Sequence, residues 1–272
     1  MTETWTETRF NRLLLTGAAG GLGSVLRERL KPWCKTLRLS DIADLGAALP
    51  GEELVQCDLA DAPAIDALLK DVDAVVHLGG ISVEGPWAPI LAANIAGLHN
   101  VYEAARRHGV GRVVFASSNH AIGFYRQDEV IGTDAVPRPD GNYGISKAFG
   151  ENLSRFYYDR YGIETVCLRI GSSFPEPRDR RMLITWLSYN DMTELVRCSL
   201  FAPKVGHSIV YGVSNNRDKW WDNSGAAHLG YVPKDSSEPF RARLEQTPPL
   251  PADDPARIFQ GGGFTKAGPY ES

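Results

Sequence analysis

Residues 12–24 read Arg12-Leu13-Leu14-Leu15-Thr16-Gly17-Ala18-Ala19-Gly20-Gly21-Leu22-Gly23-Ser24. The apolar start of this segment is typical of a β-strand, and the residues that follow it have a helical pattern. This order of strand, glycine turn and helix favours a dinucleotide-binding unit over a merely flexible loop. We expect Gly17 to permit the tight turn, Gly20 to let backbone approach a pyrophosphate, and Gly23 to allow close helix packing. Gly21 and Leu22 fall where the phosphates would meet the positive end of the helix dipole.

The second predicted strand covers residues 36–41 and ends in the carboxylate of Asp41, about 18 residues after Gly23. An acidic residue at this distance accepts hydrogen bonds from the adenosine ribose, and its charge would repel a 2′-phosphate. NAD is therefore favoured over NADP, and Ile42 is expected beside the same nucleotide. Strand alternation places Arg38 on the face opposite Asp41. The alternative is that Asp41 is an ordinary residue of a strand-end turn.

A second motif reads Tyr143-Gly144-Ile145-Ser146-Lys147. In a helix, the four-residue spacing puts the phenol and the ammonium on one face. A phenol with a pKa near 10 is a poor base at neutral pH, and an adjacent cation moves that pKa towards the working range. The same spacing also occurs by chance on helix surfaces. Here the pair Ser117-Ser118, which ends an upstream apolar run, favours a proton-transfer site.

Composition excludes several classes of protein. The chain has 272 residues, 43% of them hydrophobic, enough for one α/β domain or a domain with an appended lobe. A net charge of −4 argues against nucleic acid as a partner. No apolar run approaches a membrane span, and residues 1–11 are polar and acidic, unlike a signal peptide, so we expect a cytoplasmic protein. The four cysteines are scattered and the histidines form no ligand pattern, so we expect no metal.

Strand-like runs alternate with helical stretches through the first two thirds of the chain. The strands are expected at residues 53–58, 74–79, 112–118 and 164–171, with helices starting near Asp61, Trp87 and Tyr143. This alternation predicts an α/β fold with a Rossmann-like doubly wound parallel sheet. After Gly171 the pattern becomes irregular. We therefore expect residues 1–171 to form the NAD-binding region with the Ser/Tyr/Lys site, and residues 172–272 to form a small substrate-side lobe and tail, interleaved in one structural unit.

Further short motifs accompany the glycine turn, Asp41, the serine pair and Tyr143-x-x-x-Lys147, and they are Asp58-Leu59, His77-Leu78-Gly79-Gly80 and Asn94. Together they resemble the extended short-chain dehydrogenase/reductase superfamily, which includes NAD-dependent epimerases and dehydratases. Longer matching segments are Val76–Ser82, Phe115–His120 and Trp220–Ser224. These segments are similar to the bacterial uronate dehydrogenases within that superfamily.

The resemblance implies a role for each residue of the serine, tyrosine and lysine set. Tyr143 would be the catalytic base, Lys147 would lower its pKa and hold the nicotinamide ribose, and Ser118 would hydrogen-bond the reacting oxygen. Ser118 is preferred because it ends the strand, whereas Ser117 should point to the other face.

The resemblance also implies the rest of the cofactor site. Asp58 would bind the adenine amino group beside Leu59, while Leu78, Gly79 and Gly80 would pass close to NAD. Asn94 either joins a proton relay through water or is a buried amide that satisfies backbone groups.

The resemblance to the uronate dehydrogenases further implies a small-molecule substrate. A hexuronic acid, glucuronate or galacturonate, would be oxidised at its anomeric carbon to an aldarolactone. Arg181 would bind the carboxylate bidentately, whereas Arg178 and Arg180 fit solvated surface. Besides Ser118 and Tyr143, the expected sugar contacts are Ser82, Asn119, His120, Ser172 and Phe264. A structural role for His120 is the alternative.

Two other functions compete with this interpretation. A nucleotide-sugar epimerase or dehydratase would regenerate NAD within one turnover, so net release of NADH separates the two classes. A noncatalytic NAD-sensing protein would have no need of Tyr143 and Lys147, which this chain retains. The family and the tail also suggest a homo-oligomer.

Overall fold

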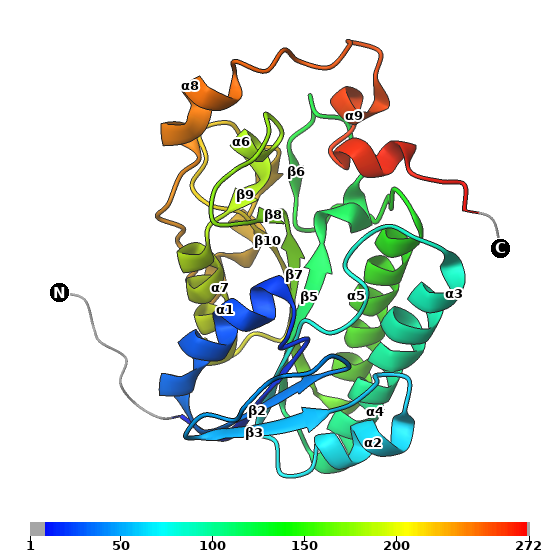
Figure 1. Ribbon diagram of the computed structural model, residues 1–272, viewed down its shortest axis with the longest axis vertical. Helices are drawn as coiled ribbons and strands as arrows, with labels where there is room; N and C mark the ends of the chain where they lie inside the picture. The colour runs from blue at the N-terminus through cyan, green and yellow to red at the C-terminus, as the bar shows by residue number, and fades with distance from the viewer. Residues whose placement is uncertain (1–8, 271–272) are drawn as a thin grey trace.

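The computed structural model describes residues 9–270. Within this range the molecule is built on a seven-stranded parallel sheet with the order β10-β7-β5-β4-β1-β2-β3 (Figure 1). The strands of this sheet are β1 (Phe10–Thr16), β2 (Cys34–Asp41), β3 (Glu52–Gln56), β4 (Ala74–His77), β5 (Arg112–Ser118), β7 (Glu164–Ile170) and β10 (His207–Gly212).

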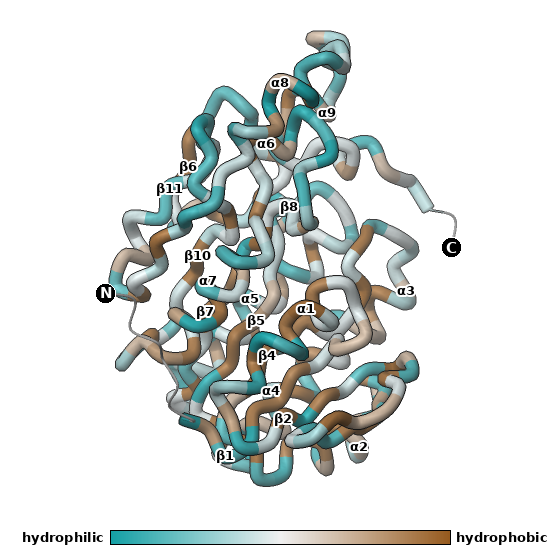
Figure 2. The backbone as a smooth tube through the Cα atoms, turned by 60° about the vertical axis from the view of Figure 1, so that its left-hand side comes forward, coloured by the Kyte–Doolittle hydropathy of each residue, from teal (hydrophilic) through white to brown (hydrophobic). Residues whose placement is uncertain are grey.

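Both faces of the sheet are covered by helices. In β1, Leu13, Leu14 and Leu15 are all fully buried, as expected for a parallel strand packed on both sides. Leu13 and Leu15 pack towards one group of helices and Leu14 towards the other. The first group is α1 (Gly21–Leu30) and α7 (Tyr189–Phe201), and the second is α2 (Ala62–Leu68), α4 (Gly97–His108) and α5 (Asn142–Tyr161). Figure 2 shows hydrophobic residues concentrated in the central strands.

The remaining elements are short, and many of them gather beyond the carboxyl ends of the strands, in the upper part of Figure 1. Two small parallel pairs join β6 (Ile131–Gly132) to β11 (Trp221–Asp222), and β8 (Ser172–Ser173) to β9 (Trp186–Leu187). The short helices are α3 (Trp87–Ile90), α6 (Met182–Thr185), α8 (Arg241–Leu244) and α9 (Pro255–Ile258), with the π-helix η2 (Leu91–Ala96) and the 3-10 turns η1 (Lys31–Trp33), η3 (Asn119–Ile122), η4 (Ser224–Leu229), η5 (Glu238–Phe240) and η6 (Gly262–Lys266).

The predicted Rossmann-like doubly wound α/β sheet is confirmed, and its first six strands lie within two residues of the expected bounds. Helix α7 and strand β10 were not expected from the sequence; both follow Gly171 and complete the layers of the main sheet. Strand β10 has an apolar run of only three residues, Ile209, Val210 and Tyr211, which is too short to reveal a strand. Helix α7 did carry a signal, since Ser188 caps it and Met192, Leu195, Val196 and Leu200 recur at helical spacing.

Three expectations concern features that are absent or masked. Residues 1–8, part of the segment judged unlike a signal peptide, lie outside the described residues. Between residues 9 and 270, no helix is both long and apolar enough to span a membrane. Over the same range, no three His, Cys, Asp or Glu side chains gather as they would around a metal ion. All four cysteines of the chain fall in this range and are buried free thiols.

Candidate active site

The turn between β1 and α1 is crowded at two of its glycines. Gly17 adopts a φ of 71°, and a Cβ there would lie 2.7 Å from the carbonyl carbon of Leu78. A Cβ on Gly23 would lie 2.0 Å from the carbonyl oxygen of Gly17. The chain itself therefore needs glycine at both positions, in agreement with the tight turn and the close helix packing predicted from the sequence.

The first turn of α1 is open to a ligand. A Cβ on Gly20 would meet nothing closer than the carbonyl oxygen of Gly17 at 3.2 Å, and one on Gly21 would meet nothing within 4 Å. The helix has no side-chain cap, and the backbone N–H groups of Gly21, Leu22 and Gly23 find no acceptor among residues 9–270. Unpaired N–H groups at the positive end of a helix dipole suit a phosphate. These residues fit a dinucleotide.

Asp41 lies at the end of β2, beside the glycine turn. Its carboxylate accepts backbone N–H groups from Ala19 at 3.0 Å and from Ala43 at 3.0 Å. Arg38 is engaged elsewhere, because it pairs with Glu53 at 2.8 Å and donates to backbone carbonyls. The Arg38 guanidinium is thus engaged by the protein and is not free to bind a 2′-phosphate beside Asp41. Ile42, next to Asp41, is exposed.

The ends of β3 and β4 approach the same edge. Asp58 is exposed there and accepts the N–H of Ala60. A Cβ on Gly79 would lie 3.1 Å from the Leu59 side chain, and one on Gly80, where φ is 115°, would lie 2.6 Å from Asn94 Oδ1. The half-buried Leu78 also follows β4.

Asn94 has its amide fully used within the protein. Its Oδ1 accepts from the N–H of Ile81 at 2.8 Å, and its Nδ2 donates to the carbonyl of Ile81 and to Ser146 Oγ at 2.9 Å each. This is the backbone-satisfying arrangement, one of the two alternatives that the sequence left open. The contact with Ser146 also fastens the loop after β4 to helix α5, which carries Tyr143.

Ser118, Tyr143 and Lys147 converge at the end of β5. Ser118 Oγ accepts the N–H of His120 at 3.2 Å and is close enough to the Tyr143 phenol to lower its pKa, and Lys147 Nζ lies 5.4 Å from the centre of the tyrosine ring. Lys147 Nζ donates to the carbonyl of Ala116 at 2.8 Å. Ser117 points to the other face, as alternation predicts, and donates to Glu151 at 2.7 Å.

The pKa values of this set differ from the simple expectation. Burial raises the pKa of Tyr143 to about 12, and the Ser118 hydroxyl only partly offsets it. Burial also lowers the pKa of Lys147 to about 8. With the protein groups alone, Lys147 therefore does not bring the phenol towards neutrality, because desolvation disfavours both charged forms and the ammonium is bound to a carbonyl.

Arg181 is held by neutral oxygens, while the carboxylates of Asp179 and Asp140 act on its charge without pairing with it. Its Nε donates to the carbonyl of Gln260 at 2.8 Å, and its Nη1 lies 3.4 Å from Ser172 Oγ. Its Nη2 donates to the Asn119 oxygen at 2.7 Å when that amide is oriented to satisfy both of its ends. Burial lowers the pKa of Arg181 to about 10, so it stays protonated at neutral pH. No carboxylate of residues 9–270 forms an ion pair with it.

The other two arginines of the same run behave differently. Arg178 is exposed and lies over the Phe174 ring, 3.8 Å from its centre. Arg180 donates to backbone carbonyls of Glu245 and Thr247. Arg181 is the member of the run that the structure brings next to Ser172 and Asn119.

His120 joins the tyrosine to the C-terminal segment. Its ring stacks on Phe264 with centres 3.8 Å apart and meets Tyr143 edge-on at 5.8 Å. Its Nδ1 lies 2.7 Å from Asp140 Oδ2. Asp140 was not predicted from the sequence, although it stands three residues before Tyr143, because a carboxylate at that place is equally consistent with an ordinary helix cap.

Two further residues were missed. Gln260 is fully buried, its side chain binds Trp221 and two backbone carbonyls, and its own carbonyl holds Arg181. Glu84 accepts the N–H groups of Asn142 and Tyr143 at 2.9 Å each, which caps helix α5. Ser82 is exposed two residues before Glu84, so its loop is tied to α5.

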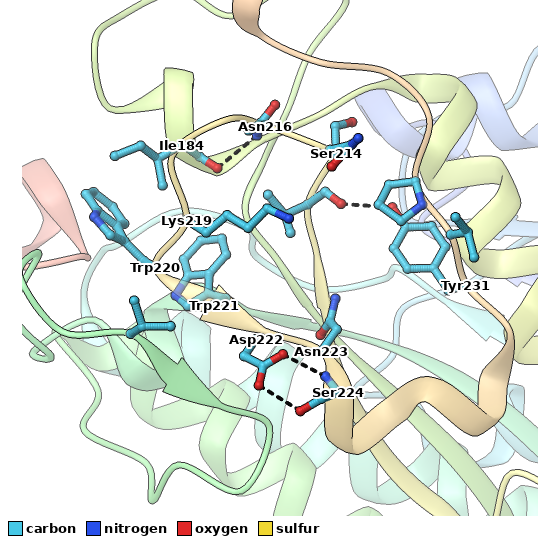
Figure 3. Close-up of a pocket in the computed structure, with 15 residues that line it drawn as sticks. Ile184, Ser214, Asn216, Lys219, Trp220, Trp221, Asp222, Asn223, Ser224 and Tyr231 are labelled. Carbon is cyan, nitrogen blue, oxygen red and sulfur yellow. Dashed lines mark hydrogen bonds between the residues drawn. The ribbon is translucent and has the colours of Figure 1, made fainter.

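A cavity of about 390 Å³ is lined by Trp221, the partner of Gln260, and by residues outside the predicted site. Figure 3 shows Lys219 extending across it between Trp221 and Tyr231. Two polar side chains on its wall are already paired, since Asn216 donates to the carbonyl of Ile184 and Asp222 accepts from Ser224. None of the predicted site residues lines this cavity.

Comparisons with known proteins agree with the geometry. The sequence profile of the NAD dependent epimerase/dehydratase family matches residues 13–192. A uronate dehydrogenase of Pseudomonas putida is 61% identical over 97% of this chain and 99% of its own length. A glucuronic acid dehydrogenase structure from Chromohalobacter salexigens superposes with a TM-score of 0.94 at 54% identity, covering 95% and 98% of the two chains.

A point variant of the Agrobacterium tumefaciens uronate dehydrogenase, solved complexed with NAD, has a TM-score of 0.94 at 52% identity and covers 96% of this chain and 99% of its own. By contrast, a UDP-galactose 4-epimerase has a TM-score of 0.70 at 21% identity and shares the fold alone. The protein therefore belongs to the NAD dependent epimerase/dehydratase family and, within it, to the group of the uronate dehydrogenases.

Proposed function

We propose that this protein is an NAD-dependent uronate dehydrogenase. It oxidises the anomeric carbon of a hexuronic acid, glucuronate or galacturonate, to the aldarolactone. The observation that carries the assignment of an acidic sugar is Arg181, a protonated guanidinium held by neutral oxygens beside Ser172 and Asn119. A half-buried guanidinium without an ion-pair partner can still take a charged, bidentate hydrogen-bond acceptor, and a substrate carboxylate has that chemistry.

The chain supplies a site for NAD along the ends of β1 to β4. The open N–H groups of Gly21 and Leu22 would bind the pyrophosphate, Asp41 the ribose, and Asp58 the adenine edge. NAD contributes an acceptor for the hydride that leaves the sugar. The dehydrogenases that this chain matches over nearly its full length, one of them complexed with NAD, support the same cofactor.

Proton handling falls to the residues at the end of β5. Tyr143 would take the proton of the anomeric hydroxyl, and Ser118, close to the phenol, would orient the reacting oxygen. Lys147, on the next turn of α5, would stabilise the phenolate only when bound ligands change the surroundings of both groups, because the protein alone leaves the pKa of Tyr143 raised to about 12. Ser82, His120 and Phe264 would complete the sugar site.

A panel assay tests reaction type and substrate class together. The purified protein is incubated with NAD and, separately, glucuronate, galacturonate, the corresponding neutral hexoses and UDP-sugars, while the absorbance of NADH is followed. We expect one NADH for each uronate consumed. Turnover of a UDP-sugar without net NADH would instead identify an epimerase, and absence of turnover would favour a sensing role.

Two variants control this assay. Tyr143→Phe should lose at least about 10³-fold in turnover while it still binds NAD, because only proton transfer is removed. Tyr161→Phe, an exposed tyrosine of the same helix, should keep the wild-type rate. Near-normal turnover by Tyr143→Phe would remove the tyrosine from its role as base.

We also propose that the protein is cytoplasmic and forms a homo-oligomer. The four buried free thiols fit a reducing cytoplasm, and the family suggests a homo-oligomer. Light scattering coupled to size-exclusion chromatography measures the assembly, and a monomer at assay concentration would contradict it.

A further inference from the structure

His120 has its two ring nitrogens in different surroundings. Nδ1 lies 2.7 Å from Asp140 Oδ2. Nε2 has no hydrogen-bond partner among residues 9–270, and the ring carrying it is held between Phe264 and Tyr143. The ring is therefore fixed on one side by the protein and free to bind a ligand on the other.

The Asp140 carboxylate is buried and only one of its oxygens has a hydrogen-bond partner. Its side chain is fully shielded from solvent, and its Oδ1 has no hydrogen-bond partner. Glycines surround the carboxylate: a Cβ on Gly261 would lie 1.8 Å from Oδ2, one on Gly123 2.0 Å from Oδ2, and one on Gly144 3.1 Å from Oδ1. The described part of the chain thus holds a half-satisfied carboxylate where an apolar side chain would cost less.

A carboxylate can only accept a hydrogen bond, so the proton of the shared bond must lie on Nδ1. The hydrogen bond made by one ring nitrogen sets the state of the other. We propose that Asp140 is a positioning residue that fixes His120 in the Nδ1–H tautomer, so that Nε2 accepts a hydrogen bond from a hydroxyl of the sugar acid. This inference rests on the proposed function and assigns a role to a residue outside the predicted site.

The charges around His120 are compatible with a neutral ring. Burial lowers its pKa, and Arg181 lowers it further, whereas Asp140 and Glu84 raise it. Tyr143 is the remaining titratable group in contact with the ring. The net shift is downward, so the ring can act as an acceptor at neutral pH. Asparagine at position 140 could donate its amide to Nδ1, which would move the proton to Nε2 and turn the acceptor into a donor.

Nitrogen NMR on the full-length protein tests the tautomer without any substrate. The protein is labelled with ¹⁵N-histidine, and the His120 signals are assigned by their loss in His120→Gln. We expect a protonated Nδ1 and an unprotonated Nε2 in the wild type, and a shift towards protonated Nε2 in Asp140→Asn. A wild-type ring protonated on Nε2 or on both nitrogens at neutral pH would overturn the proposal, whatever the enzyme assay shows.

A kinetic cycle then tests whether Asp140 acts through His120. Asp140→Asn should raise the KM for uronate about tenfold, the worth of one hydrogen bond, and leave the KM for NAD unchanged. In His120→Gln, the amide oxygen replaces Nε2 as acceptor and needs no carboxylate. Adding Asp140→Asn to that variant should therefore change the KM less than about twofold. An equal effect in both backgrounds would show a merely structural role and overturn the proposal.

The pH profile gives a readout that packing alone would not move. Because the carboxylate raises the pKa of His120, its loss in Asp140→Asn should move the acid limb of kcat/KM to lower pH. An unmoved limb would contradict the assignment. Asp128→Asn serves as the matched control, since Asp128 is an exposed carboxylate paired with Arg126 at 3.0 Å.

Discussion

Arg169 is buried and Arg181 is half-buried, and the protein treats their charges in different ways. Arg169, on β7, is 1% exposed and donates twice to Glu151, at 2.9 Å from Nε and 2.9 Å from Nη2. It also donates to Tyr211. Arg181 is bound by the backbone of Gln260 and by two neutral side-chain oxygens.

The pKa values follow the partners. The Glu151 carboxylate outweighs burial and raises the pKa of Arg169, whereas burial lowers the pKa of Arg181 to about 10. The guanidinium of Arg169 is neutralised inside the fold, whereas that of Arg181 has no ion-pair partner among residues 9–270 and fits the proposed role of binding a substrate carboxylate.

The largest effect should come from removing one partner of the buried Arg169–Glu151 ion pair. Arg169→Met leaves the Glu151 carboxylate buried without its counter-charge, which should cost about 3–5 kcal/mol of unfolding free energy in urea titrations. The double change with Glu151→Met should recover part of this loss, since no lone charge remains. If the double variant is as unstable as the single one, the pair is not what stabilises this region.

The charge of Arg181 should instead control which substrate is accepted. Arg181→Ala should lower kcat/KM for glucuronate about 10²–10³-fold, equivalent to about 3–4 kcal/mol, because the substrate carboxylate loses its charged partner. Activity on the corresponding neutral hexose should change far less. Arg178→Ala, an exposed arginine of the same run, is the control. An equal loss for acidic and neutral sugars would contradict carboxylate recognition.

A third arginine, Arg27, forms an ion pair that acid can disrupt. Arg27 binds Glu52 at 2.6 Å, and this bond lowers the pKa of Glu52 to about 2. The folded pKa is depressed, so the stabilisation is present above about pH 4.5 and is lost as the pH falls towards 2. Wild type should exceed Glu52→Gln by about 2–3 kcal/mol at neutral pH, with the gap closing in acid. A gap independent of pH would rule out the ion pair as its cause.

The smallest effect should come from alanine at two glycines with positive φ, only one of which contacts Arg181. Gly262 has a φ of 62°, and a Cβ there would lie 2.7 Å from Arg181 Cδ. Gly230 has a φ of 73° with nothing within 4 Å. Alanine should cost about 1–2 kcal/mol of stability at either position, but only Gly262→Ala should also lower kcat/KM for uronates, by about tenfold. Equal kinetics for both variants would show that Arg181 tolerates the displacement.

Local motifs were readable because neighbours in sequence are neighbours in space. Gly17 and Gly23 follow from one turn, and Tyr143 and Lys147 from one helical face. Ser117 could be separated from Ser118 by strand alternation alone. Arg181 was predicted as a substrate residue only from the resemblance, because its partner Gln260 lies far along the chain.

What the sequence could not reveal depends on burial and on distant contacts. Asp140 is defined by Gly123, Gly261 and His120, which only the tertiary fold brings together. The upward pKa shift of Tyr143 likewise arises from desolvation, which no residue spacing records.

The segment from Gln260 to Phe264 has a consequence for how the protein is made. It supplies the carbonyl that holds Arg181, the glycine against Asp140 and the ring stacked on His120. On the ribosome, the strands that form the dinucleotide crevice emerge well before this segment. The groups that contact Arg181, Asp140 and His120 are therefore made after the glycine turn and the strands beside it, so the proposed sugar site can be completed only after the proposed nucleotide site.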